Sequence, residues 1–151
     1  MSAVGKDELR SVAQTVLDQL PRKNSATILA LAGDLGAGKT TFTQALAREM
    51  GVEEVVQSPT YVLMKKYATT HPYFTTLIHI DAYRLEEPLQ FSALRPEEFL
   101  GDPHTLVCIE WPERLEGVLP KPDMVLKFSA DPPAGEAGAA NEGKRYIEGY
   151  E

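Results

Sequence analysis

The stretch Gly33-Asp34-Leu35-Gly36-Ala37-Gly38-Lys39-Thr40 matches the pattern G-x-x-x-x-G-K-[ST] of a phosphate-binding loop. Its glycines permit backbone angles at which successive N–H groups turn inward around one phosphate. In this pattern Lys39 reaches the β- and γ-phosphates, and the Thr40 hydroxyl binds Mg²⁺. Thr41 adds a further hydroxyl for the α-phosphate. The octet therefore predicts a nucleotide site formed by Asp34, Leu35, Gly36, Ala37, Gly38, Lys39, Thr40 and Thr41.

The residues around this loop predict a strand before it and a helix after it. Ala26–Ala32 is apolar without alternation, which is typical of a strand buried on both faces of a parallel sheet. After the loop, Phe42, Ala45, Leu46 and Met50 form an apolar helix face, and Gly51 is placed to end that helix. A helix N-terminus behind the loop favours the binding of an anion there.

The rest of the chain alternates between strand and helix patterns, which favours an α/β sheet. Leu9–Leu20 shows helical spacing within an expected helix over Lys6–Leu20. Further expected elements are strands at Tyr61–Lys66, Thr75–Ile80 and Thr105–Ile109, two short helices in Glu86–Leu100, a helical turn in Pro112–Leu119, and paired strands at Met124–Phe128 and Arg145–Tyr150. The Ala/Gly/Pro-rich stretch Ala130–Gly143 is expected to form a mobile hairpin tip.

These patterns predict one domain over residues 1–151 with the three-layer fold of P-loop NTPases. Its central sheet should be mostly parallel, with an antiparallel hairpin at the C-terminal edge. The length of 151 residues suits a single domain with its own core.

Composition limits the partners and the compartment. Fifteen Lys and Arg against 22 Asp and Glu give a net charge of −7, which disfavours a broad nucleic-acid-binding surface. The single cysteine, Cys108, excludes an intramolecular disulfide and suits a reducing compartment. There is no apolar run of 18 residues, and Met1–Asp7 lacks the apolar segment of a signal peptide. We therefore expect a cytoplasmic protein that does not contact membranes.

Two carboxylates are candidates for the chemistry of a phosphoryl-transfer site. Asp81 and Glu110 each follow an apolar strand directly, and the carboxyl ends of such strands border the ligand crevice of α/β sheets. Either acid could hold the metal or orient water, and either could instead be a helix cap or a solvated strand end. Ser58-Pro59-Thr60 could meet the γ-phosphate as a switch segment does, or could form an ordinary turn. Trp111 could flank the nucleotide or a partner, or could pack in the core.

Together these motifs resemble the TsaE family, also called YjeE. The resemblance rests on Gly-Asp-Leu-Gly-Ala-Gly-Lys-Thr-Thr at 33–41, Ser-Pro-Thr-Tyr at 58–61, His-Ile-Asp-Ala-Tyr-Arg at 79–84 and Ile-Glu-Trp-Pro at 109–112, in that order. It covers the chain from about Leu9 to Phe128 and implies a mixed sheet.

The resemblance also implies roles for individual residues. Lys39 and Thr40 would hold phosphate and Mg²⁺, and Glu110 would complete the Mg²⁺ shell. Asp81 would be a second essential acid. The remaining implied nucleotide neighbours are the switch residues Ser58 and Thr60, together with Trp111 and a basic residue that is either Lys144 or Arg145.

The function implied by the resemblance is Mg²⁺-dependent ATP hydrolysis in support of tRNA modification. TsaE proteins act on a TsaB–TsaD complex, which transfers threonylcarbamoyl to adenosine-37 of tRNA. They do not modify tRNA themselves, and the net charge of −7 suits a helper that does not bind tRNA strongly. The implied cofactors are ATP and Mg²⁺.

Three other functions share the phosphate loop. A small GTPase would need N-K-x-D, and the nearest stretch, Pro120-Lys121-Pro122-Asp123, lacks the Asn. A small-molecule kinase would usually add a lid that bears arginines, and Glu86–Leu100 offers only Arg95. An ATP-gated binding module would keep Lys39 and Thr40 without needing either acid for turnover.

Overall fold

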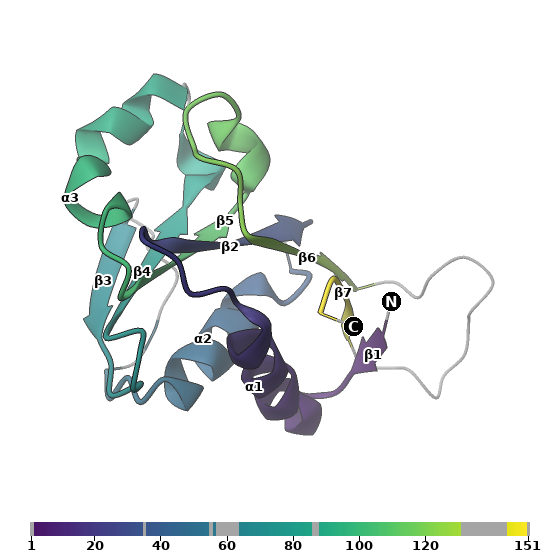
Figure 1. Ribbon diagram of the computed structural model, residues 1–151. Helices are drawn as coiled ribbons and strands as arrows, with labels where there is room; N and C mark the ends of the chain where they lie inside the picture. The colour runs from purple at the N-terminus through teal and green to yellow at the C-terminus, as the bar shows by residue number, and fades with distance from the viewer. Residues whose placement is uncertain are drawn as a thin grey trace.

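The computed structural model describes residues 2–34, 36–54, 56, 64–85, 88–130 and 145–150 (Figure 1). In this part of the chain the strands form one seven-stranded sheet in the order β1-β7-β6-β2-β5-β4-β3. The strands are β1 (Ser2–Val4), β2 (Thr27–Gly33), β3 (Met64–Ala68), β4 (Thr76–Asp81), β5 (Thr105–Glu110), β6 (Met124–Ser129) and β7 (Arg145–Glu148).

The sheet is mixed, as the family resemblance implied, with the predicted parallel centre and antiparallel pairs at both edges. The four central strands β6, β2, β5 and β4 are parallel. The flanking pairs β3–β4, β6–β7 and β1–β7 are antiparallel. The β3–β4 pair follows from its short connection, because parallel neighbours need a crossover of a dozen or more residues. The antiparallel hairpin of β6 and β7 is confirmed, but β1 lies outside it and forms the edge of the sheet.

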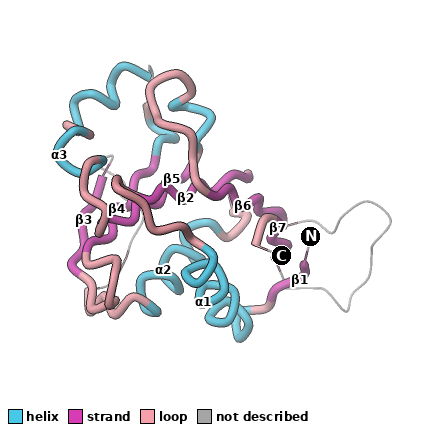
Figure 2. The backbone as a smooth tube through the Cα atoms, viewed as in Figure 1, coloured by secondary structure: helices cyan, strands magenta, loops and turns pink. Residues whose placement is uncertain are grey.

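Helices cover both faces of the sheet, which confirms the expected three layers (Figures 1 and 2). The 3₁₀ turn η1 (Lys6–Glu8) leads into α1 (Leu9–Gln19), which packs with α2 (Lys39–Glu49) on one face. The opposite face carries the short elements η2 (Ala82–Arg84), η3 (Pro88–Leu94), α3 (Glu97–Leu100) and η4 (Pro112–Leu115).

The buried strand before the loop explains why both layers are needed. Leu29 and Leu31 of β2 point into the core beneath α1 and α2, whereas Ile28 packs in the core of the opposite face. A strand that is apolar on both sides is stable only when both sides are covered. The uninterrupted apolar pattern of Ala26–Ala32 therefore correctly predicted a strand that is buried on both faces of the sheet.

Several element boundaries differ from the expected ones. The segment Glu86–Leu100 does contain two short helices, η3 and α3, although residues 86–87 lie outside the described part. The strand expected at Tyr61–Lys66 begins at Met64 in the described residues, because 61–63 lie outside them. Residues 131–144 are also outside, and with them nearly all of the expected hairpin tip at Ala130–Gly143 and the basic candidate Lys144.

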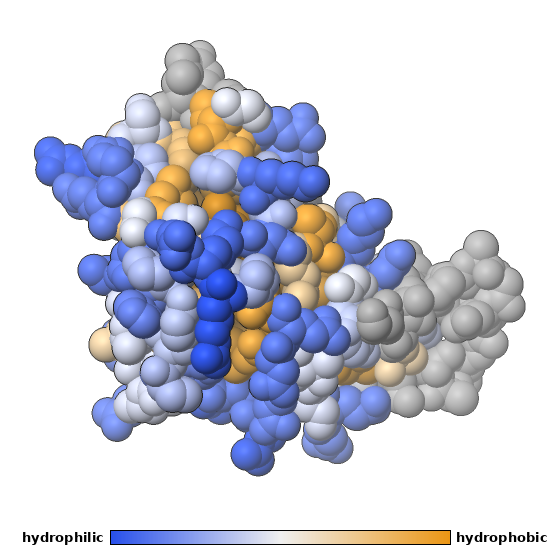
Figure 3. Space-filling model, in the orientation of Figure 1, coloured by the Kyte–Doolittle hydropathy of each residue, from blue (hydrophilic) through white to orange (hydrophobic). Residues whose placement is uncertain are grey.

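The visible surface is mainly polar. Figure 3 shows hydrophilic residues over most of the face seen in Figure 1, with apolar residues in patches between them. Within the described ranges, none of the helices has the length and apolar character needed to cross a membrane.

Candidate phosphate-binding site

The glycine-rich loop connects the end of the central strand β2 with the start of α2. Gly33 has φ +142°, and a Cβ atom on it would lie 2.4 Å from the carbonyl oxygen of Phe128. Gly38 has φ +104° and stands directly before α2. Both backbone conformations disfavour other residues. The loop therefore has the glycines its path requires, and it ends where the α2 N-terminus offers unpaired N–H groups.

Lys39 is buried at the first position of α2, with 4% of its surface exposed. Its ammonium group donates a hydrogen bond to the Gly33 carbonyl and lies 3.6 Å from the centre of the Trp111 ring. Burial lowers the pKa of Lys39, and the nearby carboxylates Glu110, Glu113, Asp81 and Asp34 act in the opposite direction. The lysine is thus a buried cation surrounded by acidic groups.

Thr40 and Glu110 meet although 70 residues separate them in the chain. The Thr40 hydroxyl lies 3.2 Å from Oε1 and 3.4 Å from Oε2 of Glu110, which is 3% exposed at the end of β5. β5 lies next to β2 in the sheet, so the carboxyl end of β5 reaches the loop. The structure therefore brings together the two residues that the sequence proposed as metal ligands.

Glu110 has a second partner, which the sequence reasoning missed. Nε2 of His79 lies 2.6 Å from Oε2 of Glu110, and His79 is fully buried on the neighbouring strand β4. The available signal was spacing: His79 stands two residues before Asp81 and therefore points to the same face of the strand.

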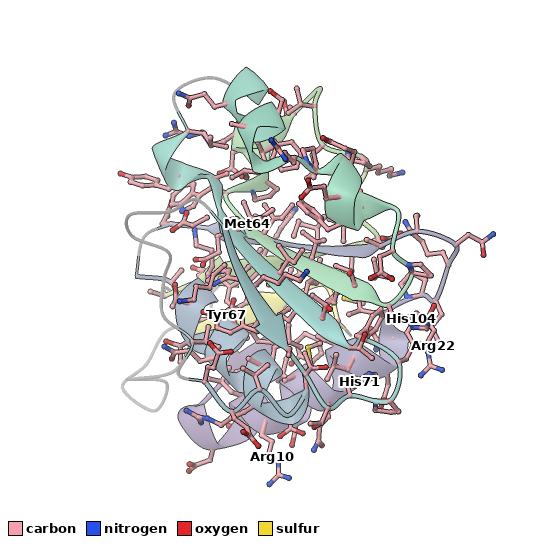
Figure 4. The ribbon with its side chains drawn as sticks, turned by 90° about the vertical axis from the view of Figure 1, so that its left-hand side faces the viewer. Arg10, Arg22, Met64, Tyr67, His71 and His104 are labelled. Carbon is pink, nitrogen blue, oxygen red and sulfur yellow. The ribbon has the colours of Figure 1, made fainter. Side chains whose placement is uncertain are left out.

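The other two histidines lie elsewhere. His71 and His104 are found with Arg22 around Tyr73, at the end of the sheet where β4 and β5 begin (Figure 4). Burial and the charge of Arg22 lower the pKa of His71, whose Nδ1 accepts hydrogen bonds from the backbone N–H groups of Tyr73 and Phe74. Only His79 belongs to the site among the histidines.

Asp81 is half-buried directly opposite Glu110 in the register of β4 and β5. Its Oδ1 accepts a hydrogen bond of 3.0 Å from the backbone N–H of Tyr83 and so caps η2. Asp81 therefore does act as a helix cap, which was one of the roles expected for it. The same carboxylate also acts on the charge of Lys39, so capping does not remove Asp81 from the site.

Trp111 lies beside the loop in a left-handed backbone conformation, with φ +62°. Its backbone N–H donates to the Leu31 carbonyl at 3.3 Å, and its ring centre lies 5.0 Å from that of Tyr83. The ring thus lies against Tyr83 of η2 and against the Lys39 ammonium.

The remaining loop candidates differ in their surroundings. Asp34, Gly36 and Thr41 are exposed, whereas the Ala37 side chain is buried in the core and leaves only its backbone for a ligand. Leu35, Ser58 and Thr60 lie outside the described residues.

The donor set at Thr40 and Glu110 fits Mg²⁺. Magnesium prefers oxygen ligands at roughly 2.0–2.1 Å in an octahedron, which places neighbouring ligands about 2.9 Å apart. The 3.2 Å separation of the Thr40 hydroxyl and Glu110 Oε1 is close to that value. Among the described residues, no group of three or more His, Cys, Asp or Glu side chains could hold a metal ion. One carboxylate with substrate phosphates and water is a usual Mg²⁺ shell.

Comparison with known proteins relates this chain to one family. The sequence model of the family "Threonylcarbamoyl adenosine biosynthesis protein TsaE" matches residues 4–136. The chain is 38% identical over 105 residues to the tRNA threonylcarbamoyladenosine biosynthesis protein TsaE of Haemophilus influenzae, covering 68% of this chain and 63% of that protein. It is 39% identical over 106 residues to the Bacillus subtilis protein of the same name, covering 69% and 63%.

A solved structure is also similar. The crystal structure of YdiB from Bacillus subtilis superposes with a TM-score of 0.62 at 25% sequence identity, covering 95% of this chain and 78% of that one. The matched region spans a little less than two thirds of the two curated relatives, 63% of each.

Proposed function

Because this chain belongs to the TsaE family, we propose that it is a Mg²⁺-dependent ATPase that supports the threonylcarbamoylation of adenosine-37 in tRNA. We assign it the fold of the P-loop NTPases, since a glycine-rich loop joins a central parallel strand to a covering helix. It acts in the cytoplasm on a complex of the TsaB–TsaD type and does not bind tRNA strongly itself.

The contact between Thr40 and Glu110 carries this proposal. Any turn can contain glycines and a lysine, but a nucleotide-hydrolysing site also needs an acid next to the loop hydroxyl. Here a buried carboxylate from another strand lies within 3.2 Å of that hydroxyl. A buried acid at this point is costly unless it has a cation or a donor to interact with.

Each residue of the site has a role in the proposed reaction. Lys39 leaves the Gly33 carbonyl and binds the β- and γ-phosphates, while the loop N–H groups surround them. Thr40 and Glu110 would hold Mg²⁺, which would supply charge neutralisation at the transferring phosphate. Glu110 and Asp81 border the space in which the attacking water must be oriented.

Three further residues complete the proposed nucleotide site. Ser58 and Thr60 contact the γ-phosphate as a switch segment, and Trp111 lies beside the bound nucleotide. The proposed partner is a TsaB–TsaD complex, and hydrolysis keeps that complex cycling.

Calorimetry with Mg·ATP tests the site. The wild type should bind, and Lys39→Ala should lose about 2–4 kcal/mol of binding free energy, because the phosphates lose their nearest cation. Lys23→Ala is the matched control. It removes a lysine that is paired with Asp123 at 2.9 Å, at the start of β6 and away from the loop, so nucleotide binding should not change. Equal binding by wild type and Lys39→Ala would contradict the phosphate-loop assignment.

Turnover tests the activity and the partner. ATP hydrolysis is measured with and without a TsaB–TsaD complex, together with capture of that complex in ATP and in ADP. Hydrolysis that depends on the complex supports the proposal. Binding without hydrolysis in the full mixture would indicate an ATP-gated module, and a phosphorylated acceptor would indicate a kinase.

A further inference from the structure

We propose that His79 is a positioning residue for the metal-binding carboxylate. In this inference, which rests on the proposed function, its imidazole holds Oε2 of Glu110 so that Oε1 is presented to Thr40 and to Mg²⁺. The geometry points to it: Nε2 lies 2.6 Å from Oε2, and the carboxylate is also in contact with the Thr40 hydroxyl.

The parallel pairing of β4 and β5 brings His79 within reach of Glu110. In the parallel register of β4 and β5, His79 lies opposite Cys108 and Asp81 lies opposite Glu110. His79 therefore reaches Glu110 diagonally across the two strands, from the position two residues before Asp81 on β4. Cys108 lies 3.7 Å from the Thr43 hydroxyl of α2, so this face of the sheet is the one covered by α2.

The surroundings of His79 make a packing role alone a poor explanation. Leu77 and Leu106, which lie on the same face of the sheet, are apolar and fully buried. His79 is also fully buried, and its Nδ1 has no hydrogen-bond partner among the described residues. Leaving a buried polar atom unpaired is unfavourable. A leucine would avoid that cost. The presence of a histidine is therefore explained by the hydrogen bond between its other nitrogen, Nε2, and Glu110.

The direction of the hydrogen bond follows from the partner. A carboxylate oxygen accepts, so Nε2 carries the proton and donates it. A glutamate side chain has three rotatable bonds, and fixing one oxygen removes much of that freedom. Partners that orient a ligating carboxylate in this way typically change metal affinity or activity by about 10- to 100-fold when they are removed.

The first test uses the free protein, so that it does not depend on nucleotide. NMR of protein labelled with ¹⁵N-histidine should show His79 protonated at Nε2, with a slowly exchanging N–H that shifts strongly in Glu110→Gln. A His79 protonated only at Nδ1, or insensitive to Glu110→Gln, would overturn the inference.

The second test measures the Mg²⁺ concentration that half-saturates ATP hydrolysis. For His79→Leu it should rise by about 10- to 100-fold, while ATP affinity in EDTA stays within about twofold of wild type. For His79→Gln, whose amide nitrogen reaches about as far as Nε2, the Mg²⁺ requirement should return to within about threefold of wild type. Leu77→Ala, on the same strand and face, should lower the thermal midpoint without changing the Mg²⁺ requirement.

The outcomes separate the two proposals. A wild type that neither binds nor hydrolyses Mg·ATP contradicts the proposed function itself. If hydrolysis by the wild type depends on Mg²⁺ and His79→Leu has the same Mg²⁺ requirement, only the proposed role of His79 is overturned. If His79→Leu does not fold, His79→Asn takes its place, because its amide is too short to reach Glu110. His79→Asn should then differ from His79→Gln in Mg²⁺ requirement, and equal requirements would overturn the inference.

Discussion

The ammonium group of Lys39 lies 3.6 Å from the centre of the Trp111 ring and donates a hydrogen bond to the Gly33 carbonyl. Both contacts satisfy a buried cation, since an aromatic face and a carbonyl oxygen each attract positive charge. They do not fully replace water, because burial still lowers the pKa of Lys39. The lysine is therefore held inside the loop at a cost in stability.

This cost predicts a pH dependence that Lys39→Met should remove. With its pKa lowered in the folded state, Lys39 loses its proton on folding at pH values between the folded and the unfolded pKa. In that range the unfolded state binds more protons than the folded state. The contribution of Lys39 to the free energy of unfolding therefore rises with pH until the pH reaches the unfolded pKa of 10.5. Urea unfolding at several alkaline pH values should show a wild-type stability that rises relative to Lys39→Met. A relative fall would contradict the lowered pKa.

Glu110→Gln should separate binding from turnover. The substitution keeps the shape of the side chain but removes the charge that faces Thr40, so ATP binding should survive while hydrolysis falls by about 10²-fold or more. Hydrolysis is measured with TsaB–TsaD present. Glu113→Gln is the matched control, since Glu113 also acts on Lys39 but is exposed on η4. A wild-type rate in Glu110→Gln would make Glu110 a structural strand end and transfer the metal role to Asp81.

Gly33→Ala should destabilise the fold. The new methyl group would lie 2.4 Å from the Phe128 carbonyl oxygen, at a φ of +142° that alanine rarely adopts. We expect a loss of about 1–3 kcal/mol in the free energy of unfolding, measured by urea denaturation. Gly101→Ala serves as the control, because φ there is −84° and no atom lies within 4 Å of the added carbon. Equal effects of the two substitutions would mean that the loop relaxes freely.

Cys108 should be inert to thiol reagents until the protein unfolds. It is fully buried on β5, and burial raises its pKa to about 12. At pH 8 only about one thiol in ten thousand would be ionised, and the thiolate is the reactive form. Labelling with a disulfide reagent should therefore be slow in buffer and rapid in urea, with Cys108→Ala as the blank. Labelling in buffer at the urea rate would contradict this burial.

The local features of the site could be predicted from sequence because neighbouring residues specify them. The glycines of the loop, the apolar strand before it and the helix after it follow one another along the chain, and each has its own pattern. The same is true of Asp81 and Glu110 at the ends of β4 and β5. The parallel centre of the sheet and its C-terminal antiparallel hairpin were also expected, but no local pattern indicated that β1 joins β7 at the edge.

By itself the sequence determined which residues stand at the carboxyl ends of the central strands and that a glycine-rich loop with the G-x-x-x-x-G-K-[ST] pattern lies among them. Only the tertiary structure decided which of those residues touch. His79 and Glu110 are 31 positions apart, and Thr40 and Glu110 are 70 apart. Their contacts depend on β5 lying between β2 and β4 in parallel register. That order results from burying both faces of all three strands at once, a property of the whole sheet rather than of any one segment.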